Sequence, residues 1–209
     1  MYKICQTEQS SRRQEQIKDT FLSMLAFQNY GEITISALCA EAKIPRKTFY
    51  RYFDSKRDIF LLAIDLLMIE FETWNNAYAS RFRPQTTEKE IEKIICFFLE
   101  KKKFFDIVKQ NHLSILFFQR VLDQAISEHI NLRFVCSDST TKQQRLAMIF
   151  SVTGLLSLLW DWHQGGCKES PGELARMITP MLTVPPLMPA SGCITCDYAD
   201  SPPAGSDIL

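Results

Sequence analysis

The sequence predicts an all-α protein of about nine helices, in which a small N-terminal domain is joined by a long helix to a larger helical body. Apolar residues recur at intervals of three and four along most of the chain, which is the spacing of an amphipathic helix. Strand-like alternation is nearly absent, and glycine and proline stand where helices would end. With 209 residues and 46% hydrophobic content, the chain can form one large domain or two smaller ones.

A first helix is predicted over residues 11–28. Gly31 follows it closely and can adopt the left-handed conformation that ends many helices. Its apolar face is expected to consist of Ile17, Phe21, Met24 and Leu25.

Two short helices separated by a tight turn are predicted next. Thr34 or Ser36 can cap the first of them. Pro45 suits the first turn of the second, because its missing N–H would be unpaired there in any case. The side chains expected to form the small core of this hairpin are Ala37, Leu38, Ala40, Ile44, Phe49 and Phe53.

A long fourth helix is predicted from Ser55, with Asp58 as a capping acid, to a break at residues 81–84. Further helices are expected over residues 87–110, over 112–134 as one or two helices, over 139–164, and from Pro171 to just before Pro185. The predicted divisions are a small N-terminal domain at 1–57, a larger helical domain at 58–184, and a disordered tail at 185–209. The tail is rich in Pro, Gly, Ser and Asp.

The charge of the chain is uneven although its net charge is zero. Residues 1–60 carry ten Lys or Arg and seven Asp or Glu, and residues 43–57 carry six bases and one acid, Asp54. A local basic patch of this kind can bind phosphates while the whole protein stays neutral. The alternative interpretation is an ordinary solvated helix face.

The third helix has the pattern of a helix that reads duplex DNA. Arg46 and Lys47 stand on its first turn, from which Arg can donate two hydrogen bonds to guanine and Lys can reach the same acceptors. Tyr50, Tyr52 and Lys56 lie further along and suit phosphate contacts. The predicted DNA-contacting residues are Thr34, Ser36, Pro45, Arg46, Lys47, Thr48, Tyr50, Arg51, Tyr52 and Lys56.

The segment from Thr34 to Lys56 resembles the DNA-binding domain of the TetR (AcrR-like) family of transcriptional regulators. The resemblance is most specific at Thr48-Phe-Tyr-Arg-Tyr-Phe-Asp-Ser-Lys56 and covers residues 11–65. Two positions depart from the family pattern, because Lys43 and Lys47 stand where glycine is frequent. If Lys43 is left-handed, its side chain costs roughly 1 kcal/mol.

The resemblance implies a homodimer that binds a pseudo-palindromic operator and responds to a small ligand held in a divergent C-terminal body. It places the dimer contact on the last two long helices, at residues 140–164 and 171–183. The apolar residues predicted to form that contact are Leu155, Leu158, Leu159 and Trp162. The alternative is that these four residues belong to the core of a single chain.

Aromatic residues are dense in the central body and can line a pocket for a small apolar or aromatic effector. The alternative is that they are simply core residues. The pocket residues predicted from this density are Trp74, Tyr78, Phe98, Phe105 and Phe117.

No arrangement typical of catalysis, of a cofactor or of a metal stands out, so the chain is not predicted to be an enzyme. His112, His129 and His163 are dispersed, and the seven cysteines suit reduced thiols in the cytoplasm. Cys193 and Cys196 form a lone C-x-x-C pair, for which zinc or redox use stays an alternative. The apolar stretch from Met148 to Trp160 is shorter than the ~20 residues that a bilayer needs, so no membrane contact is predicted.

These observations together predict a DNA-binding transcriptional regulator, namely a ligand-responsive homodimeric repressor. An activator or co-regulator controlled by a protein partner instead of a small ligand is the alternative.

Overall fold

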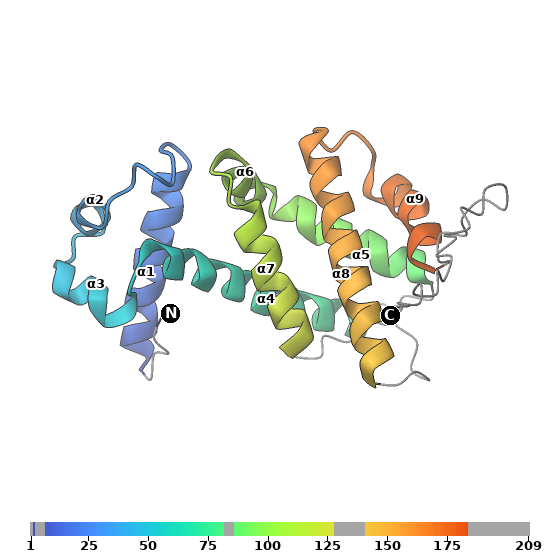
Figure 1. Ribbon diagram of the computed structural model, residues 1–209, viewed down its shortest axis with the longest axis horizontal. Coiled ribbons are helices and arrows are strands. Elements are labelled where there is room, and N and C mark those ends of the chain that lie inside the picture. The colour runs from blue at the N-terminus through green and yellow to red at the C-terminus, as the bar shows by residue number, and fades with distance from the viewer. Residues whose placement is uncertain (1, 3–6, 82–85, 128–140, 184–209) are drawn as a thin grey trace, which may run out of the picture.

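The computed structural model describes residue 2 and residues 7–81, 86–127 and 141–183. These ranges contain helices and no strand, which confirms the predicted all-α class. The helices are α1 (Glu8–Leu25), α2 (Ile35–Glu41), α3 (Arg46–Tyr52), α4 (Lys56–Arg81), α5 (Thr87–Glu100), α6 (Lys102–Gln110), α7 (Ser114–Ser127), α8 (Thr141–Gln164) and α9 (Pro171–Thr183). Figure 1 shows α1–α3 at one end of the molecule, α5–α9 at the other, and α4 extending from the first group beneath the second.

Helices α1–α3 form a small unit, here called the head, around a fully buried aromatic core. Phe21, Phe49 and Phe53 each have 0% exposure, and the last two are the inward anchors expected for the hairpin. Thr34 caps α2 by accepting a hydrogen bond from the N–H of Ala37 at 3.1 Å. The predicted inner face of α2 was partly wrong, because Ala37 and Ala40 are exposed while Leu38, Cys39 and Ala42 are buried. A seven-residue helix can bury only one narrow stripe, and the larger side chains occupy it.

Helices α4–α9 form the rest of the protein, here called the body. Its first helix, α4, begins at the head and so connects the two parts. Its start is capped as predicted, since the Asp58 carboxylate accepts hydrogen bonds from the N–H groups of Asp54 and Ser55 at 3.1 and 3.0 Å. Ile59, Phe60 and Ile64 are fully buried, and α4 packs against α1 and α7. One continuous apolar core therefore joins the two parts of the molecule.

The body differs from the prediction in the region of α5 and α6. The expected single helix over 87–110 is interrupted at Lys101, which has φ −90° and ψ 17° and ends one helix while starting the next. No glycine or proline marks this break. It is decided by packing, because α5 lies along α9 while α6 turns to meet α7. Residues 128–140 and the predicted tail at 185–209 lie outside the described residues.

Helices α8 and α9 each expose large apolar side chains. The described segment Arg145–Gln164 has a mean hydropathy of 1.3 and only 33% of it is buried, so by length and composition alone it is long and apolar enough to cross a membrane. The apolar stretch is thus longer than the thirteen residues judged from the sequence. Core helices of water-soluble proteins meet the same criterion. The exposed apolar side chains on these two helices are Leu146, Phe150, Met177 and Met181.

Candidate functional site

The outward face of α3 is polar and basic. Of the ten residues predicted to contact DNA, Thr48, Tyr52 and Lys56 are half-buried and the other seven are exposed. The Tyr50 hydroxyl lies in hydrogen-bonding contact with the guanidinium of Arg46, which raises the pKa of Arg46. Arg46 and Lys47 occupy the first turn of α3, where the helix dipole is also positive and where acidic residues are absent. Because positive charges at the N-terminal end of a helix are unfavourable, Arg46 and Lys47 do not stabilise α3. Their placement therefore indicates a role in binding and not in folding.

A basic hollow of about 330 Å³ lies beside this face, between the start of α1 and the start of α3. Three cations line it, namely Arg13 of α1, Lys43 of the turn and Arg51 of α3, and its lining contains no carboxylate. Sequence reasoning missed Arg13 because α1 is distant in sequence from α3. Only the packing of α1 beside the α2–α3 hairpin brings these charges together.

Lys43 adopts the left-handed conformation, with φ at 52°. It lies at the turn between α2 and α3, and the N–H of the next residue, Ile44, donates a hydrogen bond to the carbonyl of Cys39 at 2.9 Å. The backbone of this turn therefore has the conformation that glycine adopts most easily, and the lysine side chain adds a positive charge to the basic hollow.

Lys56 is directed into the protein and not toward the face of α3. Its ammonium donates hydrogen bonds to the carbonyl of Tyr30 and, at 3.1 Å, to that of Ile33, and it lies 4.3 Å from the centre of the Tyr30 ring. This geometry identifies Lys56 as a link between α4 and the loop that joins α1 to α2. A phosphate contact by Lys56, expected from the sequence, would compete with these bonds.

A second site lies inside the body, where α4, α5, α6, α7 and α8 surround an apolar hollow of about 100 Å³. Three of the five predicted pocket residues, Phe98, Phe105 and Phe117, line it. The rings of Phe98 and Phe105 stack with their centres 3.7 Å apart, and Phe117 meets Phe105 edge to face. The remaining lining residues are also apolar: Leu67, Met68, Phe71, Ile94, Phe97, Val121, Ala125, Val152, Leu155, Leu156 and Leu159.

The other two predicted pocket residues are not part of this lining. Trp74 packs on Phe97 with ring centres 5.5 Å apart, one layer away from the hollow. The side chain of Tyr78 lies outside the described residues. Aromatic density alone could not separate these residues from the lining, because the choice depends on which face of α4 meets α5.

The residues predicted for a subunit contact are mostly turned inward. Leu155, Leu159 and Trp162 are buried within the protomer, and the first two line the apolar hollow. Leu158 is half-buried. Helix α8 is apolar on nearly every side, so its periodicity could not indicate which side faces the protomer.

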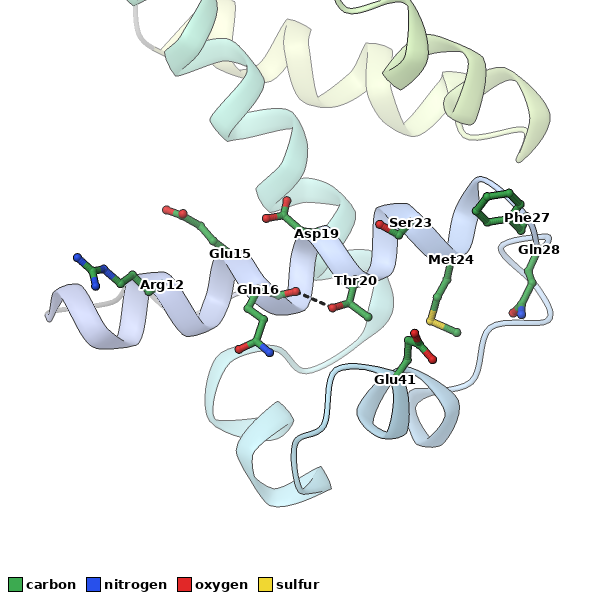
Figure 2. Close-up of a pocket in the computed structure, with 10 residues that line it drawn as sticks. All are labelled: Arg12, Glu15, Gln16, Asp19, Thr20, Ser23, Met24, Phe27, Gln28 and Glu41. Carbon is green, nitrogen blue, oxygen red and sulfur yellow. Dashed lines mark hydrogen bonds between the residues drawn. The ribbon is translucent and has the colours of Figure 1, made fainter.

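A hollow of about 810 Å³ along α1 was not predicted. Figure 2 shows that it runs along the outer face of α1 and ends near Phe27, with Glu41 of α2 across from it. Its lining includes the acids Glu15, Asp19 and Glu41. Phe27 is 90% exposed and also borders a second hollow, between α1 and α6.

Within the described residues, no group of three or more potential metal ligands comes together. His163 is buried on α8, where its Nε2 lies 2.9 Å from a carboxylate oxygen of Asp106 on α6. Burial lowers the pKa of His163, although Asp106 opposes this effect. Cys193 and Cys196 lie outside the described residues.

Two family models match the chain. A model of bacterial regulatory proteins of the tetR family matches residues 22–63, and a model of a transcriptional regulator C-terminal region matches residues 85–184. No curated protein matches the chain significantly.

Solved structures with similar folds cover most of the chain. A TetR transcriptional regulator from Streptococcus agalactiae has a TM-score of 0.56 at 18% identity, over 83% of this chain and 95% of its own. The TetR family repressor AlkX from Dietzia sp., implicated in biodegradation of n-alkanes, has a TM-score of 0.51 at 15% identity, over 81% and 94%. A tetR-family regulator from Streptomyces coelicolor has a TM-score of 0.50 at 15% identity, over 82% and 79%. At these identities the similarity shows the fold.

Proposed function

Because this chain belongs to the TetR family of DNA-binding transcriptional regulators, we propose that it is a homodimeric repressor released from its operator by a small apolar effector. The observation that most supports this proposal is the exposed basic face of α3, which lies above a fully buried aromatic core. A short helix anchored on one side and cationic on the other can enter the major groove. The proposed site of action is the cytoplasm, where the DNA would be.

The head offers two kinds of DNA contact. Arg46 and Lys47, on the first turn of α3, are proposed to read base edges. Arg13, Lys43 and Arg51 converge on the basic hollow and are proposed to hold phosphates, which position the head without specifying sequence.

The subunit contact is proposed on the outer face of α8 and α9. Leu146 and Phe150 are one turn apart on α8, Met177 and Met181 are one turn apart on α9, and all four are between 54% and 59% exposed. Gly154 lies one turn beyond Phe150 and has open space around its Cα, so a partner helix can approach closely there. A self-complementary apolar face of two helices suits a twofold dimer.

The effector is proposed to enter the hollow of the body. Every lining side chain is apolar, so a charged molecule would lose its hydration there without compensation. The hollow holds about 100 Å³, which is smaller than the roughly 300–1,000 Å³ of typical ligand pockets, so a hydrocarbon or aromatic effector would have to displace the lining rings. Binding would favour a state in which the two recognition helices no longer match successive major grooves, roughly 34–36 Å apart.

A second candidate function is control by a protein partner, as in an activator or co-regulator. The observation that favours it is Phe27, a 90% exposed aromatic side chain at the edge of the hollow along α1 (Figure 2). Substitution Phe27→Ser would abolish regulation under this candidate and leave it intact under the first.

Duplexes selected from a random pool by the full-length protein, and then titrated at several salt concentrations, test the DNA part. Affinity should fall steeply with salt, and Arg46→Ala or Lys47→Ala should reduce discrimination at one position by about 1–3 kcal/mol. Arg13→Ala should weaken binding to all selected duplexes about equally and reduce the salt slope by about one. Binding that ignores salt, or no duplex binding, would contradict the proposal.

Sedimentation of purified protein tests the dimer. Phe150→Glu places a charge in the proposed contact and should give a folded monomer. Ile115→Glu is the matched control, because Ile115 is 72% exposed on α7 and is not part of the proposed contact, so this variant should stay dimeric. If both variants behave alike, the contact lies elsewhere.

A further inference from the structure

The side chain of Asn111, at the C-terminal end of α6, joins the body to the head. It is 9% exposed and makes three hydrogen bonds. Its amide nitrogen donates to the carbonyls of Leu25 and Ile107, both at 3.0 Å, and its amide oxygen accepts from the N–H of Tyr30 at 2.7 Å. Leu25 and Tyr30 belong to the head, whereas Ile107 belongs to α6, so one buried amide spans both parts.

One of these bonds completes the first helix of the head. The last four carbonyls of a helix lack partners within it. In α1, the carbonyls of residues 22–24 accept from the backbone N–H groups of residues 26–28. The carbonyl of Leu25 accepts from Asn111 instead. The body thus supplies the last cap of a head helix.

Tyr30 extends the link to α4. Its N–H donates to Asn111 and its carbonyl accepts from Lys56, so the loop between α1 and α2 is held from two sides. Its ring packs edge to face on Phe21, in the core of the head, at 6.2 Å. The end of α6, the loop and the start of α4 therefore meet at one residue.

Helix α6 is also tied to the apolar hollow. Phe105 lines the hollow and Asp106 binds His163 of α8, while Asn111 lies six residues after Phe105, or about 9 Å along the helix. His112, directly after this helix end, is left-handed with φ at 55°, and the N–H of Leu113 donates to the carbonyl of Val108 at 3.0 Å. This closed helix end fixes Asn111 relative to Phe105.

We propose that Asn111 is a positioning residue, whose side chain sets the orientation of the DNA-reading head from the position of α6. The proposal rests on the proposed function, because orientation matters only if two heads bind one duplex. A displacement of Phe105 by an effector moves α6 and pulls Asn111 away from Leu25 and Tyr30. The head then loses a helix cap and a loop contact together.

Half-site spacing provides the test, because each added base pair shifts and rotates the second half-site. Duplexes carrying two selected half-sites are made with spacings that differ by single base pairs. The wild type should favour one spacing sharply. In Asn111→Ala the preference over the neighbouring spacings should fall about tenfold, while the salt slope is unchanged, because the phosphate contacts remain.

Two further variants separate positioning from folding. Asn111→Asp keeps the acceptor for Tyr30 and loses the donor to Leu25, so it should lose part of the spacing preference. Gln110→Ala, at the exposed neighbouring position, should keep the wild-type preference. All titrations are made well below the melting temperature of each variant. An unchanged spacing preference in both Asn111 variants, or an equal loss in Gln110→Ala, would overturn the proposal.

Hydrogen exchange of the full-length protein without DNA gives an independent readout. In Asn111→Ala the amide of Tyr30 should exchange about tenfold faster, while the amides of Phe49 and Phe53 in the core of the head keep their protection. Unchanged exchange at Tyr30 would overturn the positioning role. Absence of wild-type duplex binding would instead overturn the proposed function, so the two failures are distinguishable.

Discussion

The candidate site of the head lies on its outer surface, whereas the candidate site of the body lies in its interior. In the head, Phe21, Phe49 and Phe53 are fully buried and the basic side chains point outward. In the body, the stacked rings of Phe98 and Phe105 border an apolar hollow among five helices. A site built from outward charges requires a rigid core beneath it. A site built from a hollow requires a core that can be repacked.

The largest effect is expected from removing one aromatic ring from each core, because only the core of the head should be needed for duplex binding. Phe49→Ala should lower the free energy of unfolding by about 4 kcal/mol and abolish duplex binding, because Phe49 is the buried side chain within α3 itself. Phe105→Ala should lower it by about 3 kcal/mol and enlarge the hollow, with duplex binding retained. Urea denaturation and duplex titration measure both. Loss of duplex binding in a folded Phe105→Ala protein would remove the distinction.

The connection between the two regions gives the next effect. Lys56→Ala leaves the carbonyls of Tyr30 and Ile33 without their charged donor, and should cost about 2 kcal/mol of stability. Arg57→Ala, at the exposed next position, should stay within about 0.5 kcal/mol. Thermal unfolding distinguishes the two. Equal stability of both variants would show that the link is weak in solution.

A smaller effect of opposite sign is expected at the turn of the head. Lys43→Gly should raise stability by about 1 kcal/mol, because glycine adopts the left-handed conformation of this position without strain. Ala40→Gly, in the exposed part of α2, should instead lower stability by about 1 kcal/mol. Denaturant titration gives both values. The same sign for both substitutions would contradict the strained turn.

The smallest effect concerns pH and the body. Burial, with Lys102 and Lys109, lowers the pKa of His163 from 6.5, while Asp106 opposes the shift. As pH falls below 6.5, His163 is therefore protonated in the unfolded chain before it is protonated in the folded protein. The free energy of unfolding should decrease over this range, down to the lower pKa that His163 has in the folded protein. His163→Phe should lack this decrease, and His112→Gln, at an exposed position, should keep it. Unfolding measured between pH 7 and 5 tests the difference.

The contrast between head and body also explains what could be predicted. The caps at Thr34 and Asp58 and the anchors Phe49 and Phe53 follow from local spacing, and the structure confirms them. The break at Lys101 carries no local signal, so the predicted helix over 87–110 was continuous where the protein has two helices. Local rules fail in the body because long-range packing decides its helix ends.

The sequence by itself determined the all-α class, the order of the elements and the basic character of α3, since these depend on periodicity, caps and residue type. Tertiary structure alone decided which side chains meet. It turned Leu155 and Leu159 toward the hollow, directed Lys56 into the loop after α1, and brought Asn111 of α6 against the end of α1. The physical reason is that a helix apolar on all sides, or a long polar side chain, has several partners of similar energy. Only the packing of the whole chain chooses among them.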